Sequence, residues 1–373
     1  MPSSGSRSPE NVYKNVYKNG GDRSMRDATR PTLVTVAQRA GVSIASVSRV
    51  INGLPATPEM VERVRSASEA VGYVPDAVAR SLKAGRTGQL AFAVADVANP
   101  VYVAMMRAIE RVIKGAGYRL LLNSTDSRSD DEVALLRSLR NRYVDGLILS
   151  PIRVTPELLE ELRQVPLPVV VIGTLPADIP VDNVRADSRQ GVGLAVSHLL
   201  GLGRQSVAFI NGPIDTVPGT ARLEGYRAAL DAAGHRFDPR LVVTGDDFTF
   251  AAGRTATRVL FDRVRPDALF CANDLLAVGA LRELAAMGIR VPEDVAVVGM
   301  DDTELAEMST PALTSVSLAS EERGELAARL LLERLNHPAA PPARASVPPR
   351  LVVRASSVPE RRGNGRAPAR VTT

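Results

Sequence analysis

Apolar residues follow two patterns along the chain, helical spacing near the N-terminus and short continuous runs farther on. Between Leu33 and Asn52 the sequence reads LVTVAQRAGVSIASVSRVIN, with apolar residues three or four apart on either side of Gly41. This spacing predicts two short helices that each turn one face to a core. Thr32 and Ser43 are suitable N-caps, and a glycine suits a left-handed helix end. The pattern predicts a helix-turn-helix.

The second predicted helix, Ile44 to Ile51, has a mixed outer face. Small side chains let a helix approach base edges, Arg49 can bond a guanine in the major groove, and hydroxyls or Asn52 can hold phosphates. Taken alone, the same residues also fit an ordinary two-helix corner of an α-helical core. A third helical pattern begins at Thr57-Pro58-Glu59, and a fourth short one covers residues 76–83.

From residue 90 onward, continuous apolar runs alternate with helical patterns. The runs come in two successive sets, from LAFAVAD to PVVVIG and from SVAFINGP to VAVVGMDD. Buried apolar strands that alternate with helices predict doubly wound parallel sheets, here in two similar lobes whose strands end at a shared cleft. The intervening helices are predicted at 102–116, 130–140, 155–164, 222–233, 252–264 and 275–287.

The order VTVAQRAGVSIASVSRVING and then GYVPDAVARSL resembles the DNA-binding head and hinge of the lactose-repressor (LacI/GalR) family of bacterial transcription regulators. The resemblance extends to about residue 357 and implies an all-α helix-turn-helix head and a two-lobed α/β body like a periplasmic binding protein. The implied parts are a disordered extension at 1–29, a head at 30–75, a hinge helix and linker at 76–87, a body at 88–357 and a tail at 358–373. Within the body, the lobes are expected at 88–186 with 317–343, and at 187–316 with 344–357.

The resemblance also implies which residues meet DNA. Base reading falls on Ile44, Ala45 and Arg49, where the two apolar side chains favour contact with thymine methyls. In the hinge, Leu82 matches the leucine that the family inserts into the minor groove, and Ala79 packs beside it. The remaining expected DNA contacts, mostly to the phosphate backbone, are Thr32, Ser43, Ser46, Ser48 and Asn52.

The body resembles the sugar-binding fold that the family uses to sense its effector. The residue types after the strands suit a polyol or a sugar. Singly, Phe248 could fill the core, Arg222 could form a surface ion pair, and Asp96 or Asp301 could cap a turn. Thr174 occupies a place where many sugar-binding relatives carry an Asp, so a smaller, modified or less hydroxylated effector is expected. The implied effector contacts are Asp96, Asn99, Tyr102, Arg222, Phe248, Asn273 and Asp301.

Charge and composition support this division. Residues 1–88 hold 13 Lys and Arg against 7 Asp and Glu, whereas the 373-residue chain has a formal net charge of +5, so the basic excess lies at the end expected to meet phosphates. Cys271 is the single cysteine, which fits a reducing cytosol. The sequence has no apolar run of about 18 residues and no apolar signal core, so we expect a cytoplasmic protein without a membrane partner.

The sequence offers no catalytic or metal-binding motif. Its three histidines are scattered, and the G-x-G at Gly191 and Gly193 lies in a helical pattern rather than after a strand. We expect no enzyme activity and no cofactor, but a homodimeric regulator, most simply a repressor, that binds a pseudo-palindromic operator and responds to a sugar or related metabolite. The alternatives are a solute-binding protein without a regulatory role, or a DNA binder that senses nothing. The C-terminus has no convincing heptad extension, so we expect a dimer rather than a tetramer.

Overall fold

The computed structural model describes residues 31–74 and 85–358, which belong to two units divided at Gly85. The predicted extension at 1–29, most of the predicted hinge, with Ala79 and Leu82, and the tail from residue 359 lie outside the described residues. Among the residues that are described, no helix is both long and apolar enough to cross a membrane.

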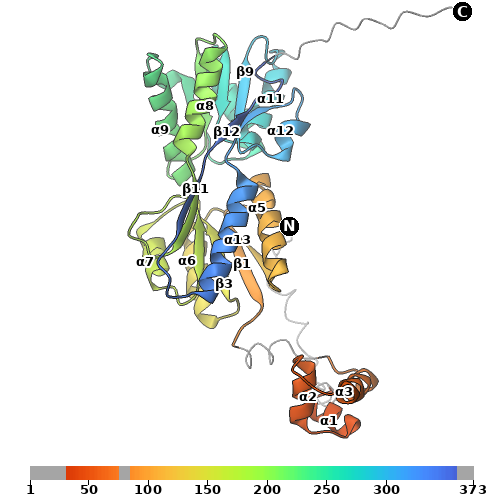
Figure 1. Ribbon diagram of the computed structural model, residues 1–373. Coiled ribbons are helices and arrows are strands. Elements are labelled where there is room, and N and C mark those ends of the chain that lie inside the picture. The colour runs from red at the N-terminus through yellow and green to blue at the C-terminus, as the bar shows by residue number, and fades with distance from the viewer. Residues whose placement is uncertain (1–30, 75–84, 359–373) are drawn as a thin grey trace, which may run out of the picture. The chain divides into compact units, whose positions relative to one another are not determined.

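The described part of the N-terminal unit, residues 31–74, forms a head of three helices, as predicted (Figure 1). Thr32 and Ser43 cap the first two helices, and Gly41 ends the first with a φ of 64°. The Arg63 side chain donates to the carbonyl oxygens of Ala40, at 2.7 Å, and Gly41, at 3.1 Å, and so holds the turn. The helices are α1 (Leu33–Ala40), α2 (Ile44–Ile51) and α3 (Pro58–Val71).

The C-terminal unit contains two parallel α/β lobes of the same design. The first sheet has the strand order β11-β5-β4-β3-β1-β2, and the second has β12-β10-β9-β8-β6-β7, with only β12 antiparallel to its neighbour. The strands are β1 (Gln89–Val94), β2 (Arg119–Ser124), β3 (Gly146–Ser150), β4 (Val169–Ile172), β5 (Asp182–Ala186), β6 (Val207–Asn211), β7 (Val242–Thr244), β8 (Ala268–Cys271), β9 (Ala296–Met300), β10 (Thr314–Ser317), β11 (Arg344–Val347) and β12 (Arg350–Val352).

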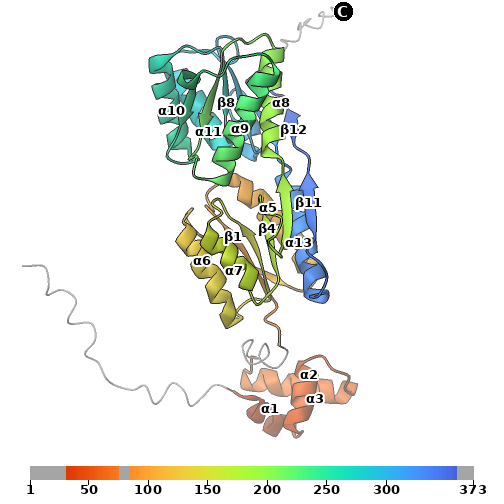
Figure 2. The ribbon, with the colours of Figure 1, turned by 90° about the vertical axis from the view of Figure 1, so that its left-hand side faces the viewer.

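Helices cover both faces of each sheet, which is why the central strands are apolar throughout. In the first lobe α5 packs beside α13 on one face and α6 beside α7 on the other, and the second lobe pairs α8 with α9 and α10 with α11 (Figures 1 and 2). The helices are α5 (Pro100–Gly115), α6 (Ser129–Ser138), α7 (Pro156–Gln164), α8 (Ser188–Gly201), α9 (Val217–Ala232), α10 (Phe250–Arg263), α11 (Asp274–Ala286), α12 (Glu304–Met308) and α13 (Ser320–Asn336), with short 3₁₀ turns at Leu139–Asn141 and Pro239–Leu241.

The chain passes between the lobes three times: after β5, after β10 and between β11 and β12. This path corrects one prediction. Residues 344–357 were expected in the second lobe, but β11 pairs in parallel with β5 in the first sheet, and only β12 joins the second. The strand is short and polar, so its sequence carries no signal of which sheet edge it joins. Pairing with the exposed edge of β5 decides its place.

Candidate functional site

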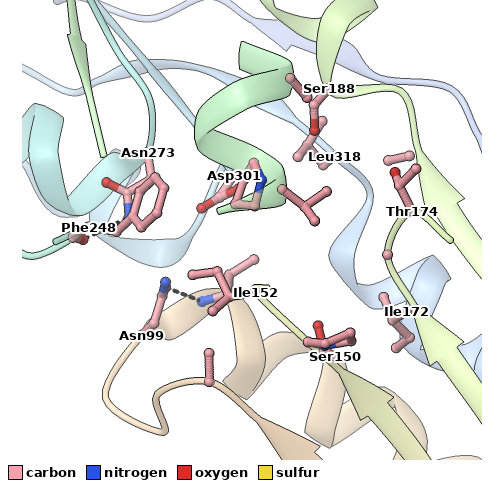
Figure 3. A pocket seen from close by; sticks show the side chains of 18 of the residues that line it. Asn99, Ser150, Ile152, Ile172, Thr174, Ser188, Phe248, Asn273, Asp301 and Leu318 are labelled. Carbon is pink, nitrogen blue, oxygen red and sulfur yellow. Dashed lines mark hydrogen bonds between the residues drawn. The ribbon is translucent and has the colours of Figure 1, made fainter. Parts of the chain in front are cut away.

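A cavity of about 440 Å³ lies between the two lobes, at the ends of their parallel strands (Figure 3). All seven residues that the sequence predicted for the pocket line it. Asp96 and Asn99 come from the segment between β1 and α5 in the first lobe, and Tyr102 comes from the first turn of α5. Arg222, Phe248, Asn273 and Asp301 come from the second lobe. The strand alternation predicted a shared cleft at this edge of the two sheets, and the family resemblance implied these seven residues.

The first-lobe wall combines turn caps with apolar side chains. The Asn99 carboxamide oxygen accepts from the Val101 N–H at 3.2 Å, and an Asp96 carboxylate oxygen accepts from the Ala98 N–H at 2.8 Å. Both side chains therefore cap local backbone and line the cavity at once. Ile152 and Ile172 add apolar surface on the same side (Figure 3).

Tyr102 adds a phenol to this wall. Burial, followed by the charge of Asp301, raises the pKa of Tyr102 to about 12. The phenol is therefore protonated at neutral pH. It can donate a hydrogen bond to a bound molecule.

The predicted residues of the second-lobe wall are more deeply buried than those of the first-lobe wall. Phe248 is 7% exposed and also packs in the hydrophobic core, so the cavity and core interpretations both apply to it. Asn273 caps α11, with its oxygen accepting from the Leu276 N–H at 2.9 Å, and its amide donates to the Phe248 carbonyl oxygen at 3.0 Å. Much of the Asn273 side chain is thus committed to shaping the wall.

Arg222 and Asp301 form the charged part of that wall. The Arg222 guanidinium donates to the Ala272 carbonyl oxygen at 2.7 Å, and its other Nη lies 3.6 Å from an Asp301 carboxylate oxygen. Both side chains are more than nine-tenths buried, which excludes a surface ion pair for Arg222. Burial raises the pKa of Asp301 and lowers the pKa of Arg222, and each charge opposes the shift of the other. Asp301 also has a φ of 106°, a left-handed conformation that non-glycine residues adopt at a cost.

The cavity contains one buried cation that the sequence did not predict, Arg323. It lies in the first turn of α13, is 8% exposed and donates to the Ser320 hydroxyl at 3.1 Å. Gly324 lets α13 approach α5 closely, because a Cβ there would lie 2.6 Å from the Met105 carbonyl oxygen. In the sequence, Arg323 follows Glu321 and Glu322 and resembles a solvated helix start. No feature of the neighbouring sequence distinguishes Arg323 from an exposed residue of that kind.

Direct contacts join the lobes beside the cavity. The Arg153 side chain in the first lobe forms an ion pair with Asp215 in the second, with an Nε–Oδ2 distance of 2.9 Å. The Val217 N–H at the start of α9 donates to the Ile152 carbonyl oxygen at 2.9 Å. In this structure the two lobes are therefore in direct contact beside the cavity.

In the head, α2 presents the predicted outer face. Ile44 is 48% exposed, Ala45 and Arg49 are exposed as well, and Val47 on the opposite side is fully buried. The remaining predicted positions take part in the local helix structure. Thr32 and Ser43 are the caps, the Ser46 hydroxyl lies 2.9 Å from that of Ser43, and the Asn52 amide donates to the carbonyl oxygen, at 2.7 Å, and the hydroxyl of Ser48.

A small head that exposes one helix face and a two-lobed body with a cavity between its lobes define a ligand-responsive, DNA-binding transcription regulator. The chain belongs to the lacI family of bacterial regulatory proteins. The model of that family matches residues 32–76, and the model of the periplasmic binding protein-like domain matches residues 196–357.

Full-length relatives support the assignment. The ribose operon repressor of Escherichia coli K12 is 36% identical over 329 residues, which are 87% of this chain and 99% of that protein. The HTH-type transcriptional regulator CelR of Thermobifida fusca is 39% identical over 345 residues, with 89% and 100% covered. Each aligns with both the head and the body.

Solved structures agree with this fold. The lac repressor dimer bound to operator and the anti-inducer ONPF matches with a TM-score of 0.78 at 26% identity, covering 88% of this chain and 99% of that one. A complex of the regulator CelR with cellobiose matches with a TM-score of 0.67 at 37% identity, covering 88% and 100%. Within the described residues, no cluster of His, Cys, Asp or Glu could hold a metal ion.

Proposed function

We propose that this protein is a cytoplasmic, homodimeric repressor, without enzyme activity, that binds operator DNA through its heads and responds to a small polar metabolite in the cavity between the lobes. One observation carries the proposal. A chain with an exposed recognition-helix face also brings seven side chains from two lobes to one cavity between them. A solute-binding protein would need the cavity but not the head.

In the proposed DNA complex, α2 enters the major groove. Arg49 reads a guanine, and Ile44 and Ala45 contact thymine methyls or fit the local shape of the groove. Thr32, Ser43, Ser46, Ser48 and Asn52 supply phosphate contacts through hydroxyls, amide groups and helix-terminal N–H groups. Two heads of a homodimer would read the two halves of a pseudo-palindromic site.

Ala79 and Leu82 are proposed to act between the head and the body. An apolar side chain such as Leu82 can wedge into the minor groove, unstack a base step and bend the duplex. Both residues lie outside the described part of the chain. Their proposed role rests on the family resemblance alone.

The proposed switch works through the two lobes. A ligand that contacts Asn99 and Tyr102 on one side and Arg222 and Asp301 on the other binds best when the lobes are together. It can shift the equilibrium only by the difference in its affinity for the two lobe arrangements. The Arg153–Asp215 ion pair and the Val217–Ile152 hydrogen bond bias the same equilibrium.

Footprinting of the full-length protein on the DNA upstream of its own coding sequence tests the DNA-binding half. Arg49→Ala should weaken specific binding by roughly 1–3 kcal/mol, whereas Arg65→Ala, which removes an exposed arginine from α3, should have a small effect. An unchanged footprint with Arg49→Ala would show that the assigned face is wrong. A wild-type protein without any specific footprint would refute the proposed function as a whole.

A further inference from the structure

Two buried guanidinium groups face the cavity from opposite lobes. Arg222 belongs to α9 of the second lobe, and Arg323 belongs to α13, which packs on the first lobe. One buried carboxylate in the cavity wall, Asp301, interacts with both cations. Burial lowers the pKa of Arg323 to about 10, with Asp301 opposing this shift and Arg222 contributing to it, so Arg323 remains charged at neutral pH.

Neither guanidinium group is fully hydrogen-bonded. The Nε atoms of Arg222 and Arg323 are both buried and have no hydrogen-bond partner among the described residues. Asp301 does not fill the gap, since its nearest oxygen is 3.6 Å from an Arg222 Nη, beyond an ordinary hydrogen bond. A charged donor that is buried without an acceptor is costly, so such groups in native proteins call for a partner.

Other carboxyl groups nearby do not supply that partner. Asp274 accepts from the Ser315 hydroxyl and from Thr303, and burial, followed by the charge of Asp301, raises its pKa to about 7. Glu132 is buried away from the cavity lining, and burial likewise raises its pKa to about 7. Neither group carries a full negative charge at neutral pH.

The remaining acids of the cavity wall lie at less buried positions. Asp96, Asp187 and Asp247 each accept from a backbone N–H of a nearby residue. The basic residues at the same rim are exposed Arg185 and Arg189, the second of which pairs with Glu224. Asp96 is half-buried, whereas Asp187, Asp247 and both arginines are exposed and screened. The buried charged groups of the cavity are Arg222, Arg323 and Asp301, which leaves an excess of about one positive charge there.

We propose that the effector is a small hydroxylated monocarboxylate, of the sugar-acid class, whose carboxylate lies between Arg222 and Arg323. This inference rests on the proposed function, since it names the chemistry of the molecule that the cavity binds. Planar guanidinium groups match carboxylate oxygens in geometry, and charge-assisted hydrogen bonds of this kind are the strong ones. A single negative charge balances the excess, whereas a phosphate dianion would place surplus negative charge beside Asp301.

The rest of the cavity suits the hydroxylated part of such a ligand. Thr174, Ser150 and Asn99 offer hydroxyl and amide groups on the first-lobe side, with Phe248 opposite (Figure 3). Thr174 is uncharged, so the protein does not repel an acidic ligand at that place. An anion held by one arginine from each lobe would also offset their mutual repulsion and favour the closed arrangement.

Binding measurements on the full-length protein test the proposal. The probes are hexuronates, hexonates and pentonates, each paired with its neutral amide or parent sugar, together with hexose 6-phosphates. We expect at least one acid to bind roughly ten times more tightly than its neutral partner, and the phosphates to bind more weakly than the acid. A neutral sugar that binds as well as its acid, a preferred phosphate, or a panel in which no acid binds would each overturn the proposal.

Variants of α13 separate the ligand contact from a structural role. Arg323→Gln should weaken binding of the acid roughly 10- to 100-fold and leave its neutral partner nearly unaffected, and Arg323→Lys should keep part of the preference for the acid. Arg329→Gln removes the same charge from an exposed position of the same helix and should change neither. An acid-to-neutral ratio that Arg323→Gln does not alter would contradict the assigned contact.

Operator footprints of the same proteins keep the two proposals distinct. If a neutral compound releases the operator, the proposed function stands and the sugar-acid inference fails. If the wild-type protein binds no specific DNA, the proposed function fails whatever the cavity binds. An Arg323→Gln protein that still gives the wild-type footprint is folded, so its loss of acid binding then reports the cavity.

Discussion

The head and the body are stabilised by cores of very different size. Over residues 31–74, the head buries six apolar residues, three of them alanines, between α1, α2 and α3. The body contains the largest fully buried side chains of the described residues, including Phe209, which stacks on Tyr226 and on Phe270 at centroid distances of 5.1 Å. The head therefore relies on local features such as helix caps, whereas the body relies on dense packing between elements distant in sequence.

Because their cores differ in size, we expect the head and the body to lose stability under different conditions. A small core loses a large share of its stability when one methyl group is removed, while a large core tolerates the same change. We therefore expect that DNA binding is lost under conditions in which ligand binding persists. Substitutions in each core, measured on the same full-length protein, test this expectation.

The largest expected effect is in the body. Phe209→Ala removes both ring stacks from the second-lobe core and should lower the free energy of unfolding of the body by about 3–5 kcal/mol. Urea denaturation followed by far-ultraviolet circular dichroism measures it. Phe250→Ala, at a position that is 40% exposed, serves as the control. Equal destabilisation by both variants would argue against the packing account.

A smaller change in the head should have the greater functional consequence. Val47→Ala removes buried methyl groups opposite the DNA-reading face and should destabilise the head by about 2 kcal/mol. We expect a lost or weakened footprint with an unchanged urea transition of the body. Val34→Ala, at a 47% exposed position of α1, should leave the footprint intact. A shift of the body transition with Val47→Ala would mean that the two units do not unfold separately.

The smallest expected effect concerns pH and again separates the units. Glu132 in α6 is 1% exposed, whereas the carboxylates of Glu59, Glu62 and Glu69 in the head are exposed. Burial raises the pKa of Glu132 from 4.5 to about 7. Its stabilising contribution is therefore complete below about pH 4.5 and is lost as pH rises through about 7.

Glu132→Gln should consequently raise the free energy of unfolding of the body by about 1 kcal/mol at pH 8 and leave it unchanged near pH 4.5. Urea titrations at the two pH values measure the difference. Asp274, whose pKa is also raised, should preserve part of the decrease in the free energy of unfolding with rising pH. Glu157→Gln, an exposed substitution on α7, is the matched control. A gain that is equal at both pH values would exclude titration of Glu132 as its cause.

The sequence predicted what short-range signals determine. Thr32, Gly41 and Ser43 lie within a few residues of the helix ends that they form, so the head could be predicted almost to the residue. The strand pattern predicted the cleft, and the family resemblance supplied the seven cavity residues, including Arg222 inside α9. Helix α9 was placed too late: it begins at Val217, capped by Thr216, rather than at Arg222.

The missed features depend on long-range packing. Arg323 reaches the cavity only because α13 returns to pack on α5, and nothing near it in sequence indicates that return. Strand β11 was assigned to the wrong lobe because its place depends on the free edge of β5. The partners of Arg222 could not be deduced either, since Ala272 and Asp301 follow different strands.

The three crossings between the lobes have a consequence for synthesis on the ribosome. The first lobe lacks α13 and β11 until residue 347 has been made, and the second lacks β12 until residue 352. The head is complete much earlier and can fold while the body is still being translated. A nascent chain thus carries a finished DNA-reading module before its sensor exists. Premature termination late in the body would release a head without the lobes that regulate it.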